Sequence, residues 1–232
     1  MQSSLLKNIR VFEWHGWLLA TAQYSREEFS PTLWYSANID VPFEVKNAVV
    51  KRQAEFLAGR LLIQQLQKIL MVEQLPIKVS KGRSPIWPSG FQGSISHSSG
   101  HVWCGYSAQV KRSLGLDVER VIDDSLVDTI ASQCLTHSER NFLSIEPSKI
   151  QLNYTIAFAS KEALYKALFR DCQKIMDFKD VCVVDISENQ LVLQLTTDWS
   201  QKWRSGDTIL VDYWVGSKFV RVACEVEMRN DN

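Results

Sequence analysis

Alternating hydrophobic and polar residues near the N-terminus predict β-strands, because successive side chains of a strand point to opposite faces. From Pro42 to about Leu70 the apolar residues recur near helical spacing instead, which predicts one long helix. Gly59 interrupts this helix, so it marks a point where another backbone or a ligand approaches closely. The helix is expected to bury Val45, Val49, Phe56, Leu61, Leu62, Leu66 and Ile69. The strands expected before it are Arg10–Trp14, Trp17–Gln23 and Leu33–Ala37.

The rest of the chain switches between the same two patterns. Leu75–Gly93 is rich in Pro and Gly and is expected to be a loop region. The stretch from about Lys149 to Cys172 contains no Pro or Gly and is expected to form a long central helix. Shorter helices are expected at about Ser125–Cys134 and Thr136–Leu143. The expected strands are Gln92–His97, His101–Ser107, Arg112–Arg120, Val181–Ile186, Gln190–Thr196, Thr208–Gly216 and Phe219–Glu227.

This order of elements gives each half of the chain a set of strands and one long helix. The pattern is typical of an α+β fold, here with two similar lobes, each a small, mainly antiparallel sheet packed with a long helix. We place the junction near Val110–Ser113, with an N-terminal lobe at residues 1–111 and a C-terminal lobe at residues 112–232. No sequence identity between the two halves is evident.

Composition narrows the function classes. Of the 232 residues, 45% are hydrophobic and 22% are charged, which is ordinary for a globular protein. The formal net charge is zero, so no overall field attracts nucleic acid or an anionic membrane. The five cysteines form no C-x-x-C pair, which indicates reduced thiols in a cytoplasm and argues against disulfides or a zinc site. No signal peptide or membrane-spanning run is expected.

The first candidate for chemistry is the helical stretch Phe158–Arg170, which reads F-A-S-K-E-A-L-Y-K-A-L-F-R. Glu162 and Lys166 lie four residues apart and share one helical face, with Lys161 beside them. A carboxylate and an ammonium on an otherwise apolar helix can bind a metal ion and a phosphate. An ordinary helical ion pair is the commoner explanation when such a pair is taken alone. The other face is expected to be core: Phe158, Leu164, Tyr165 and Leu168.

The second candidate is the strand motif L-G-L-D-V-E at Leu114–Glu119. Asp117 and Glu119 point to the same side of a strand. Two such carboxylates suit Mg²⁺, which proteins usually hold through one or two carboxylates together with water and substrate phosphate. Glu162 can supply a third oxygen from the helix. A solvated strand face is the simpler explanation for an isolated D-x-E motif.

The remaining candidates are cations and small hydroxyls. Arg52 and Arg60 lie eight residues apart, about two helical turns, so their guanidinium groups can clamp phosphates from one face. The segment Lys81–Gly82–Arg83, followed by Ser96 and His97 at a strand end, suits a phosphate and a nucleobase. A charged solvated helix face and ordinary turn chemistry explain the same residues without a ligand.

Common alternatives have little support in the sequence. It contains neither a Walker-type P-loop nor a G-x-G-x-x-G motif. Ser96 and His97 are adjacent on a strand and point to opposite faces, which disfavours a serine hydrolase. A Mg²⁺-dependent nuclease fits poorly, because Glu162 and Lys166 are more widely spaced than E-x-K and no basic DNA-binding surface is evident.

Taken together, the order and spacing of these motifs resemble one known family. The strings are K-R-x-x-E-F-L-A-G-R, G-R-S-P-x-W-P-x-G-x-x-G-S-I-S-H-S, G-L-D-V-E and S-K-E-A-L-Y-K, which span about Lys51 to Lys166. This combination resembles the Sfp-type 4′-phosphopantetheinyl transferases, in particular the branch that includes the enterobactin-synthase enzyme. Ala159 stands where the family usually has a small polar residue, and Leu114 and Leu116 where Val or Ile is common. All charged motif positions are present.

The resemblance implies that the chain transfers the phosphopantetheine arm of coenzyme A to a serine of an apo carrier protein. Adenosine 3′,5′-bisphosphate is then the second product. It also implies a pseudo-dimer of two lobes with the active site in the cleft between them, in a cytoplasmic monomer with no nucleic-acid or membrane partner. A non-catalytic module that binds coenzyme A or a carrier remains the alternative.

The resemblance further implies a role for each motif residue. Asp117, Glu119 and Glu162 are the expected Mg²⁺ ligands, and Asp117, Glu162 and Lys166 the expected catalytic residues. Glu162 is a ligand, a base or both. The carrier is an acyl or peptidyl carrier of siderophore, polyketide or fatty acid synthesis, and Ser125–Ser148 is the segment expected to contact it. The expected coenzyme A contacts are Arg52, Arg60, Arg83, Ser96, His97, Lys161 and Lys166.

Overall fold

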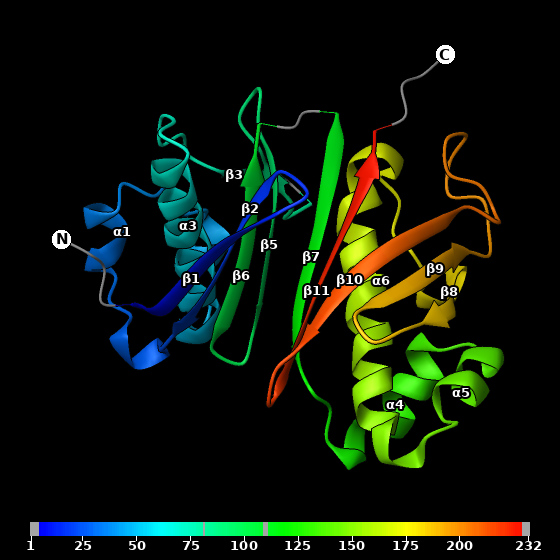
Figure 1. Cartoon of the computed structure of the whole chain (residues 1–232). Coiled ribbons are helices and arrows are strands. Elements are labelled where there is room, and N and C mark those ends of the chain that lie inside the picture. Colours follow the sequence, from blue (N-terminus) through cyan, green and yellow to red (C-terminus); the bar gives the residue numbers. More distant parts are fainter. Residues whose placement is uncertain (1–4, 81, 109–110, 229–232) are drawn as a thin grey trace. The chain divides into compact units, whose positions relative to one another are not determined.

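A computed structural model describes residues 5–80, 82–108 and 111–228 of the chain (Figure 1). The chain divides into two compact units, Met1–Val110 (unit 1) and Lys111–Asn232 (unit 2). Each unit is α+β, with an antiparallel sheet and one long helix, as the sequence pattern predicts. Lys81 and Val110, which the sequence places in a candidate loop and at the junction, lie outside the described residues.

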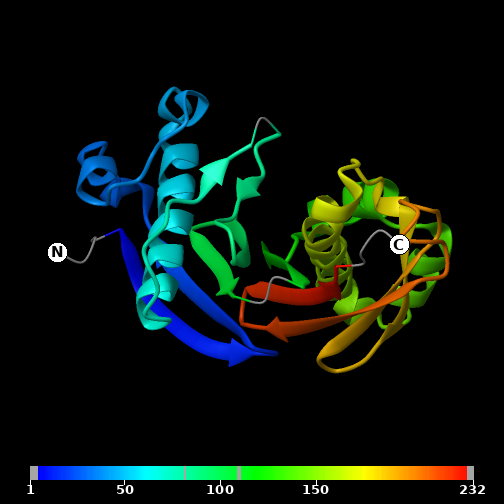
Figure 2. The same cartoon turned by 90° about the horizontal axis from the view of Figure 1, so that it is seen from above.

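Unit 1 is built on a four-stranded antiparallel sheet in the order β1-β2-β6-β5. Helix α3 (Val50–Ile69) packs on one face of this sheet, as Figure 2 shows. Its Leu57, Leu62 and Leu66 are fully buried in the core of the unit. The strands are β1 (Leu6–Trp14), β2 (Trp17–Tyr24), β5 (Gln92–Ser98) and β6 (His101–Ser107).

Three expectations for unit 1 are wrong. Leu33–Ala37 forms the short helix α1 (Thr32–Ser36), which anchors buried Trp34 against Phe29 and Phe56 and so shows no strand pairing. The long helix is two helices, α2 (Phe43–Lys46) and α3. The loop region contains a two-stranded sheet of β3 (Lys78–Val79) and β4 (Pro85–Ile86). The remaining short element is the 3₁₀ helix η1 (Arg26–Glu28).

The break between α2 and α3 has a local cause. The Asn47 side chain donates to the carbonyl oxygen of Phe43 at 2.8 Å, and Val49 has extended backbone angles, φ −60° and ψ 151°. Asn competes with backbone hydrogen bonding in this way and favours helix ends. Val49 lies at this break and is 73% exposed. Ile69, at the other end of α3, is 51% exposed. Both residues were expected in the core, and this expectation is wrong.

Unit 2 is built on a five-stranded antiparallel sheet in the order β7-β11-β10-β9-β8. Helix α6 (Ile150–Cys172) packs on it through Ala163, Leu164 and Leu168, whereas Phe158 and Tyr165 are only half-buried. Helices α4 (Asp124–Cys134) and α5 (His137–Leu143) lie beside α6 (Figure 1). The strands and 3₁₀ helices are β7 (Arg112–Arg120), β8 (Val181–Ile186), β9 (Gln190–Leu195), β10 (Thr208–Val215), β11 (Phe219–Glu227), η2 (Pro147–Lys149) and η3 (Phe178–Asp180).

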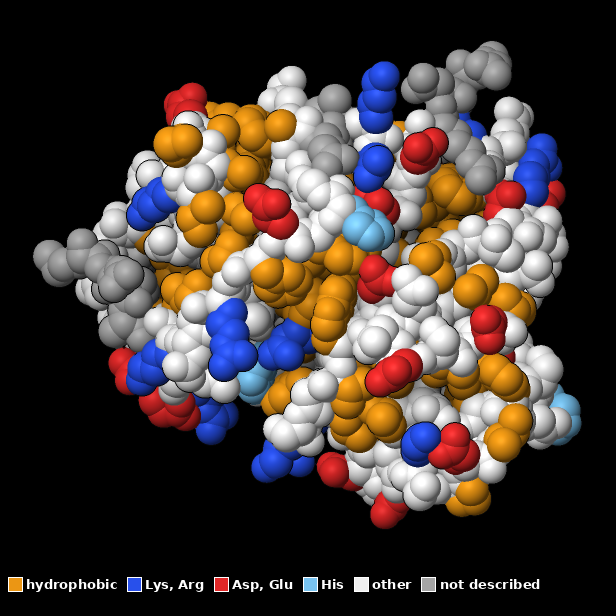
Figure 3. Space-filling model, in the orientation of Figure 1, with side chains coloured by type: hydrophobic (Ala, Val, Ile, Leu, Met, Phe, Trp, Pro, Cys, Tyr) orange, Lys and Arg blue, Asp and Glu red, His pale blue; other side chains and the backbone are white. Residues whose placement is uncertain are grey.

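The face of the molecule shown in Figure 3 has no dominant charge. On this face, acidic and basic side chains are both scattered among hydrophobic ones, in keeping with a formal net charge of zero. Within the described part of the chain, every helix is too short or too polar to cross a membrane.

Candidate functional site

Strand β7 and helix α6 approach each other unusually closely at Gly115. A Cβ atom on this residue would lie 1.8 Å from the backbone oxygen of Ala163 on α6, so only glycine fits. This close contact places the part of α6 that carries Glu162 and Lys166 against β7, the strand that carries Asp117. As a result, the Lys166 Nζ donates to the Leu116 carbonyl oxygen at 3.0 Å and to the Asp117 Oδ1 at 2.7 Å.

Asp117, Glu162 and Lys166 form one electrostatic cluster. Asp117 is 3% exposed, and its charge is balanced by the Lys166 ammonium. Burial raises the pKa of Glu162; Lys166 partly offsets this rise, and the negative charge of Asp117 adds to it. The structure therefore brings together the three residues to which the family resemblance assigns catalysis, and the raised pKa of Glu162 means that its carboxyl group resists ionisation.

The donor set at this cluster fits a magnesium ion. Mg²⁺ takes oxygen ligands and often only one or two protein carboxylates, the rest being water and phosphate. Asp117 and Glu162 supply such a pair. Glu119 lies two residues along β7, on the same side as Asp117, and is half-buried. Among the described residues, no three His, Cys, Asp or Glu side chains are gathered closely enough to hold a metal ion. A ligand role for Glu119 therefore stays a prediction.

Lys161 lies next to Glu162 in sequence, but its side chain enters the core of unit 2. The ammonium is completely buried and donates to Glu139 and to the carbonyl oxygens of Cys134 and Phe178, all at 2.8–3.0 Å. Its three N–H groups are thus satisfied inside the unit. This geometry favours a structural role over the coenzyme A contact expected from the family motif.

Glu139 is the other half of this buried pair, and the sequence reasoning missed it. Its carboxylate accepts from the Thr136 backbone and hydroxyl and from the Val183 backbone N–H, as well as from Lys161. The pair therefore joins α5, α6 and the edge strand β8. One signal was available: the T-x-x-E spacing of Thr136 and Glu139 is a capping box.

A second cluster lies in unit 1, where α3 meets β5. Arg52 Nη1 and His97 Nε2 are 3.0 Å apart, so the two residues expected near one phosphate are in contact. Glu55 lies behind them, with its Oε2 3.7 Å from His97 Nδ1 and 3.9 Å from Arg52 Nη1. Tyr24 donates to the same carboxylate at 3.5 Å; burial and the Glu55 charge raise the pKa of Tyr24 to about 12. Glu55 thus partly offsets a cationic site.

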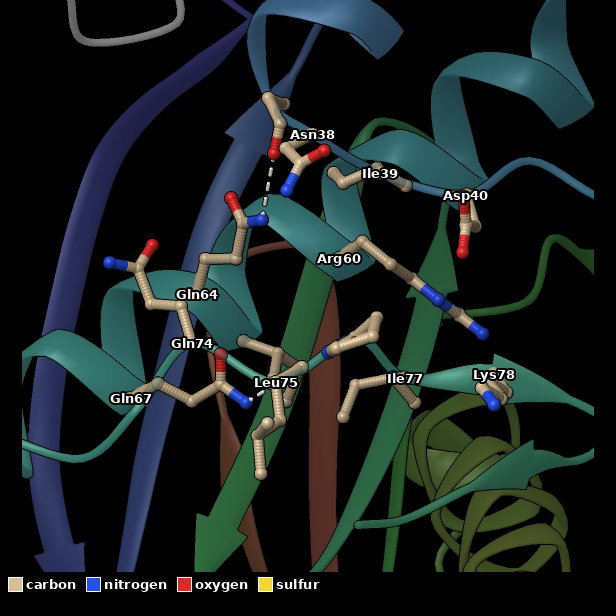
Figure 4. Close-up of a pocket in the computed structure, with 13 residues that line it drawn as sticks. Asn38, Ile39, Asp40, Arg60, Gln64, Gln67, Gln74, Leu75, Ile77 and Lys78 are labelled. Atoms are coloured by element: carbon tan, nitrogen blue, oxygen red, sulfur yellow. Dashed lines mark hydrogen bonds between the residues drawn. The ribbon is translucent and has the colours of Figure 1, made fainter.

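Arg60 lines a pocket of about 330 Å³ beside α3 (Figure 4). Its guanidinium stacks over the Phe56 ring at 4.1 Å and extends toward the side of the pocket where Asp40 and Lys78 lie. Burial lowers the pKa of Arg60 to about 10, and the positive charge of Arg52 contributes to the decrease, so the two cations lie within electrostatic range of each other. The Arg60 Nε is buried without a hydrogen-bond partner among the described residues. An anion in this pocket would satisfy it.

The other predicted contacts of unit 1 lie on β5 and in the β3–β4 turn. Ser96 is buried, and His97 is its half-buried neighbour on β5. Arg83 is exposed and has a left-handed backbone angle, φ 67°, with its N–H bonded to the Ser80 carbonyl oxygen. The structure thus joins Arg52 to His97 and brings Arg60 within electrostatic range of Arg52. It leaves Arg83 on a separate turn.

Comparison with known proteins connects these clusters to one family. A model of the 4′-phosphopantetheinyl transferase N-terminal domain matches residues 42–104, and a model of the 4′-phosphopantetheinyl transferase superfamily matches residues 113–217. Enterobactin synthase component D of Salmonella typhi is 27% identical over 179 residues, which cover 72% of this chain and 74% of the relative.

Two further relatives agree. Enterobactin synthase component D of Salmonella typhimurium is 30% identical over 151 residues, covering 65% of this chain and 62% of the relative. The 4′-phosphopantetheinyl transferase PptT of Mycobacterium tuberculosis is 26% identical over 171 residues, covering 72% of this chain and 70% of the relative. The two family models together match most of the chain, which therefore belongs to the 4′-phosphopantetheinyl transferase superfamily.

Proposed function

We propose that this chain transfers 4′-phosphopantetheine from coenzyme A to a serine hydroxyl of an apo carrier protein and releases adenosine 3′,5′-bisphosphate. The observation that carries the proposal is the Asp117–Lys166–Glu162 cluster in a chain of this superfamily. The cluster brings together the Asp117 carboxylate, the Lys166 ammonium and the Glu162 carboxyl. Such groups can accept a proton from a hydroxyl and stabilise negative charge on a phosphoryl group during transfer.

In this reaction the serine Oγ forms a bond to the β-phosphorus of coenzyme A. The bond from that phosphorus to the bridging oxygen breaks, and adenosine 3′,5′-bisphosphate leaves with the electron pair. The serine proton passes to a base, for which Glu162 is the candidate because it lies beside Lys166 and Asp117 and because burial raises its pKa, which makes it a stronger base than an ordinary carboxylate. Lys166 is placed to oppose the negative charge on the pyrophosphate oxygens.

Asp117 and Glu162, joined by Glu119, are the residues that would hold Mg²⁺. Bound there, the ion would neutralise charge on the pyrophosphate. The protein would contribute a buried carboxylate on β7 and a half-buried carboxyl on α6, where the two elements are in close contact at Gly115.

We assign the cationic residues of unit 1 to the nucleotide end of coenzyme A. Arg52 and His97 are the candidates for the 3′-phosphate, because their side chains are in contact and the arginine has further N–H groups with which to bind an anion beside them. Arg60, with its buried and unsatisfied Nε, is a further anion contact. Arg83 and Ser96 complete the expected set. Lys161 is left out of it because its ammonium is fully used inside unit 2.

We expect the carrier to contact the segment Ser125–Ser148, which contains most of α4 and all of α5. This segment presents apolar side chains to solvent, including Leu126, Phe142 and Ile145, the last of them 74% exposed. Peptidyl carriers of siderophore synthesis and acyl carriers of polyketide or fatty acid synthesis are both candidates. The five free cysteines support a cytoplasmic location, and the family resemblance supports a monomer.

The test is an intact-mass assay. Purified protein is mixed with coenzyme A, Mg²⁺ and an apo peptidyl or an apo acyl carrier, with an EDTA control. A gain of one phosphopantetheine on a carrier, lost in EDTA, is the expected result, and the relative rates identify the preferred carrier class. Binding of coenzyme A without mass gain on either carrier would support a binding module instead. Absence of both would refute the proposed function.

A further inference from the structure

The Lys166 ammonium occupies one oxygen, Oδ1, of the Asp117 carboxylate in this structure. Its Nζ is 2.7 Å from Asp117 Oδ1 and also donates to the Leu116 carbonyl oxygen at 3.0 Å. The Asp117 side chain is 4% exposed, whereas the lysine side chain is 28% exposed. The carboxylate is therefore fixed on β7, while the lysine reaches it from α6 along a partly solvated path.

The same ammonium acts electrostatically on a second carboxyl group, Glu162. Asp117 raises the pKa of Glu162, and Lys166 lowers it, so all three groups interact electrostatically. Removing the lysine charge would leave the buried Asp117 and the half-buried Glu162 with one cation fewer beside them. The two acids would then bind a divalent cation more strongly, because the cation would no longer face the charge of Lys166.

A metal ion and the ammonium compete for the same atom. Mg²⁺ binds a carboxylate oxygen at about 2.0–2.1 Å, which leaves no room for an ammonium on the same lone pairs and adds like-charge repulsion. The lysine has somewhere else to go, since its four-carbon stem is flexible and phosphate oxygens attract an ammonium strongly.

We propose that Lys166 is a placeholder cation, which occupies the Asp117 carboxylate in the free protein and must move away for a divalent ion to bind there. The proposal rests on the proposed function, which places metal and pyrophosphate at this cluster.

The placeholder couples the two ligands of the site. Coenzyme A draws Lys166 from Asp117 to the pyrophosphate, which frees the carboxylate for the metal. Metal bound to Asp117 in turn releases the ammonium for the pyrophosphate. By linkage, each ligand raises the affinity for the other by the same factor, and Lys166 contributes part of that factor.

The test measures metal binding to the full chain without coenzyme A or carrier. Mn²⁺ serves as the probe, and free Mn²⁺ is followed by electron paramagnetic resonance. Lys166→Met is expected to lower the Mn²⁺ dissociation constant about tenfold relative to the unmodified chain. Lys179→Met is the matched control: this exposed lysine of unit 2 donates only to the Ser132 carbonyl oxygen at 2.8 Å, and its loss is expected to leave Mn²⁺ binding unchanged.

A second pair of variants separates displacement from a general effect of charge. In an Asp117→Asn background, the Lys166→Met gain is expected to fall below about twofold, because the contested carboxylate is absent. Coenzyme A is expected to raise Mn²⁺ affinity by a smaller factor in Lys166→Met than in the unmodified chain. A melting curve checks that each variant is folded.

A folded Lys166→Met protein that binds Mn²⁺ no more tightly than the unmodified chain would overturn the placeholder. A gain that persists in full without Asp117 would overturn it as well. Neither outcome touches the proposed function, which stands or falls on mass transfer to a carrier by the unmodified chain.

Discussion

Two buried lysine–carboxylate contacts in unit 2 differ in what surrounds them. The Lys161–Glu139 pair is completely buried, and hydrogen bonds from neighbouring elements use every remaining position on both groups. The Lys166–Asp117 contact is shared with a third charge, Glu162, whose pKa is raised by burial in spite of the lysine. The first arrangement specifies structure, and the second keeps charges available for a reaction.

Replacing Lys161 by Met is expected to destabilise the protein by about 3–5 kcal/mol, because Glu139 would be left as an unpaired buried charge. Urea unfolding measures the change. Lys179→Met, which removes an exposed lysine from the same region, is expected to stay within about 0.5 kcal/mol. A Lys161→Met variant as stable as the Lys179→Met control would contradict the structural role.

Replacing Glu162 by Gln is expected to stabilise the fold at neutral and alkaline pH. Burial raises the folded-state pKa of Glu162 above its unfolded value, so the folded protein holds this proton more tightly than the unfolded chain. Stability is therefore lost as the pH rises from the unfolded to the folded pKa, and the penalty remains at higher pH. The neutral amide avoids that penalty.

The measurement for this variant is the melting temperature as a function of pH, in EDTA. The Glu162→Gln protein should melt above the unmodified chain at pH 8, and the difference should shrink as the pH falls below the unfolded pKa. An equal or lower melting temperature of Glu162→Gln at pH 8 would mean that the ionised Glu162 carboxylate does not destabilise the folded protein.

At the scale of elements, the catalytic cluster depends on how closely β7 lies against α6. The alternating pattern predicted β7 to the residue, and helical spacing placed Glu162 and Lys166 on one face. The sequence did not reveal that Lys161 enters the core, because its partners Cys134, Glu139 and Phe178 lie 17–27 residues away. Short elements such as α1 were also beyond prediction, since a single buried Trp34 rather than a periodic pattern fixes them.

Gly115→Ala is expected to reduce transfer activity strongly and to lower stability by about 1–3 kcal/mol, because the new methyl group would meet the Ala163 backbone. Gly59→Ala is the matched control. There the added Cβ would lie 2.8 Å from the Cγ2 methyl group of Ile95, so a side chain and not a backbone would have to move, and Ala favours the helix by about 1 kcal/mol. Comparable losses in both variants would argue against a special contact at Gly115.

At the scale of the whole chain, the two units carry different chemistry. The described part of unit 1 offers cations, with Arg52 on His97 and Arg60 in its pocket, and unit 2 offers the carboxylates and Lys166. The sequence motifs indicated both groups, but only the family resemblance assigned them to one substrate. Isolated D-x-E or R-x-x-x-x-x-x-x-R patterns are too common on solvated surfaces to do so. Helical spacing also places Glu55 near these arginines, but its burial and its contacts with Arg52 and His97 became apparent only in the structure.

Because unit 1 is proposed to bind the nucleotide and unit 2 to carry out the chemistry, Arg52→Ala should change mainly KM and Asp117→Ala mainly kcat. Loss of a charge-assisted hydrogen bond costs about 1.5–3 kcal/mol, so Arg52→Ala should raise the KM for coenzyme A about tenfold or more with little change in kcat. The KM for 3′-dephospho-coenzyme A should stay the same, since that analogue lacks the group Arg52 is proposed to bind. Asp117→Ala should lower kcat about 100-fold or more with both substrates while leaving the fold intact.

The comparison of the two substrates makes these assignments separable. If Arg52→Ala impairs coenzyme A and its dephospho analogue equally, Arg52 does not read the 3′-phosphate, although the transferase activity itself would stand. If a folded Asp117→Ala protein keeps normal kcat, the acid on β7 is neither a metal ligand nor a catalytic group. The Lys166 contact at 2.7 Å would then be an ordinary ion pair between a strand and a helix.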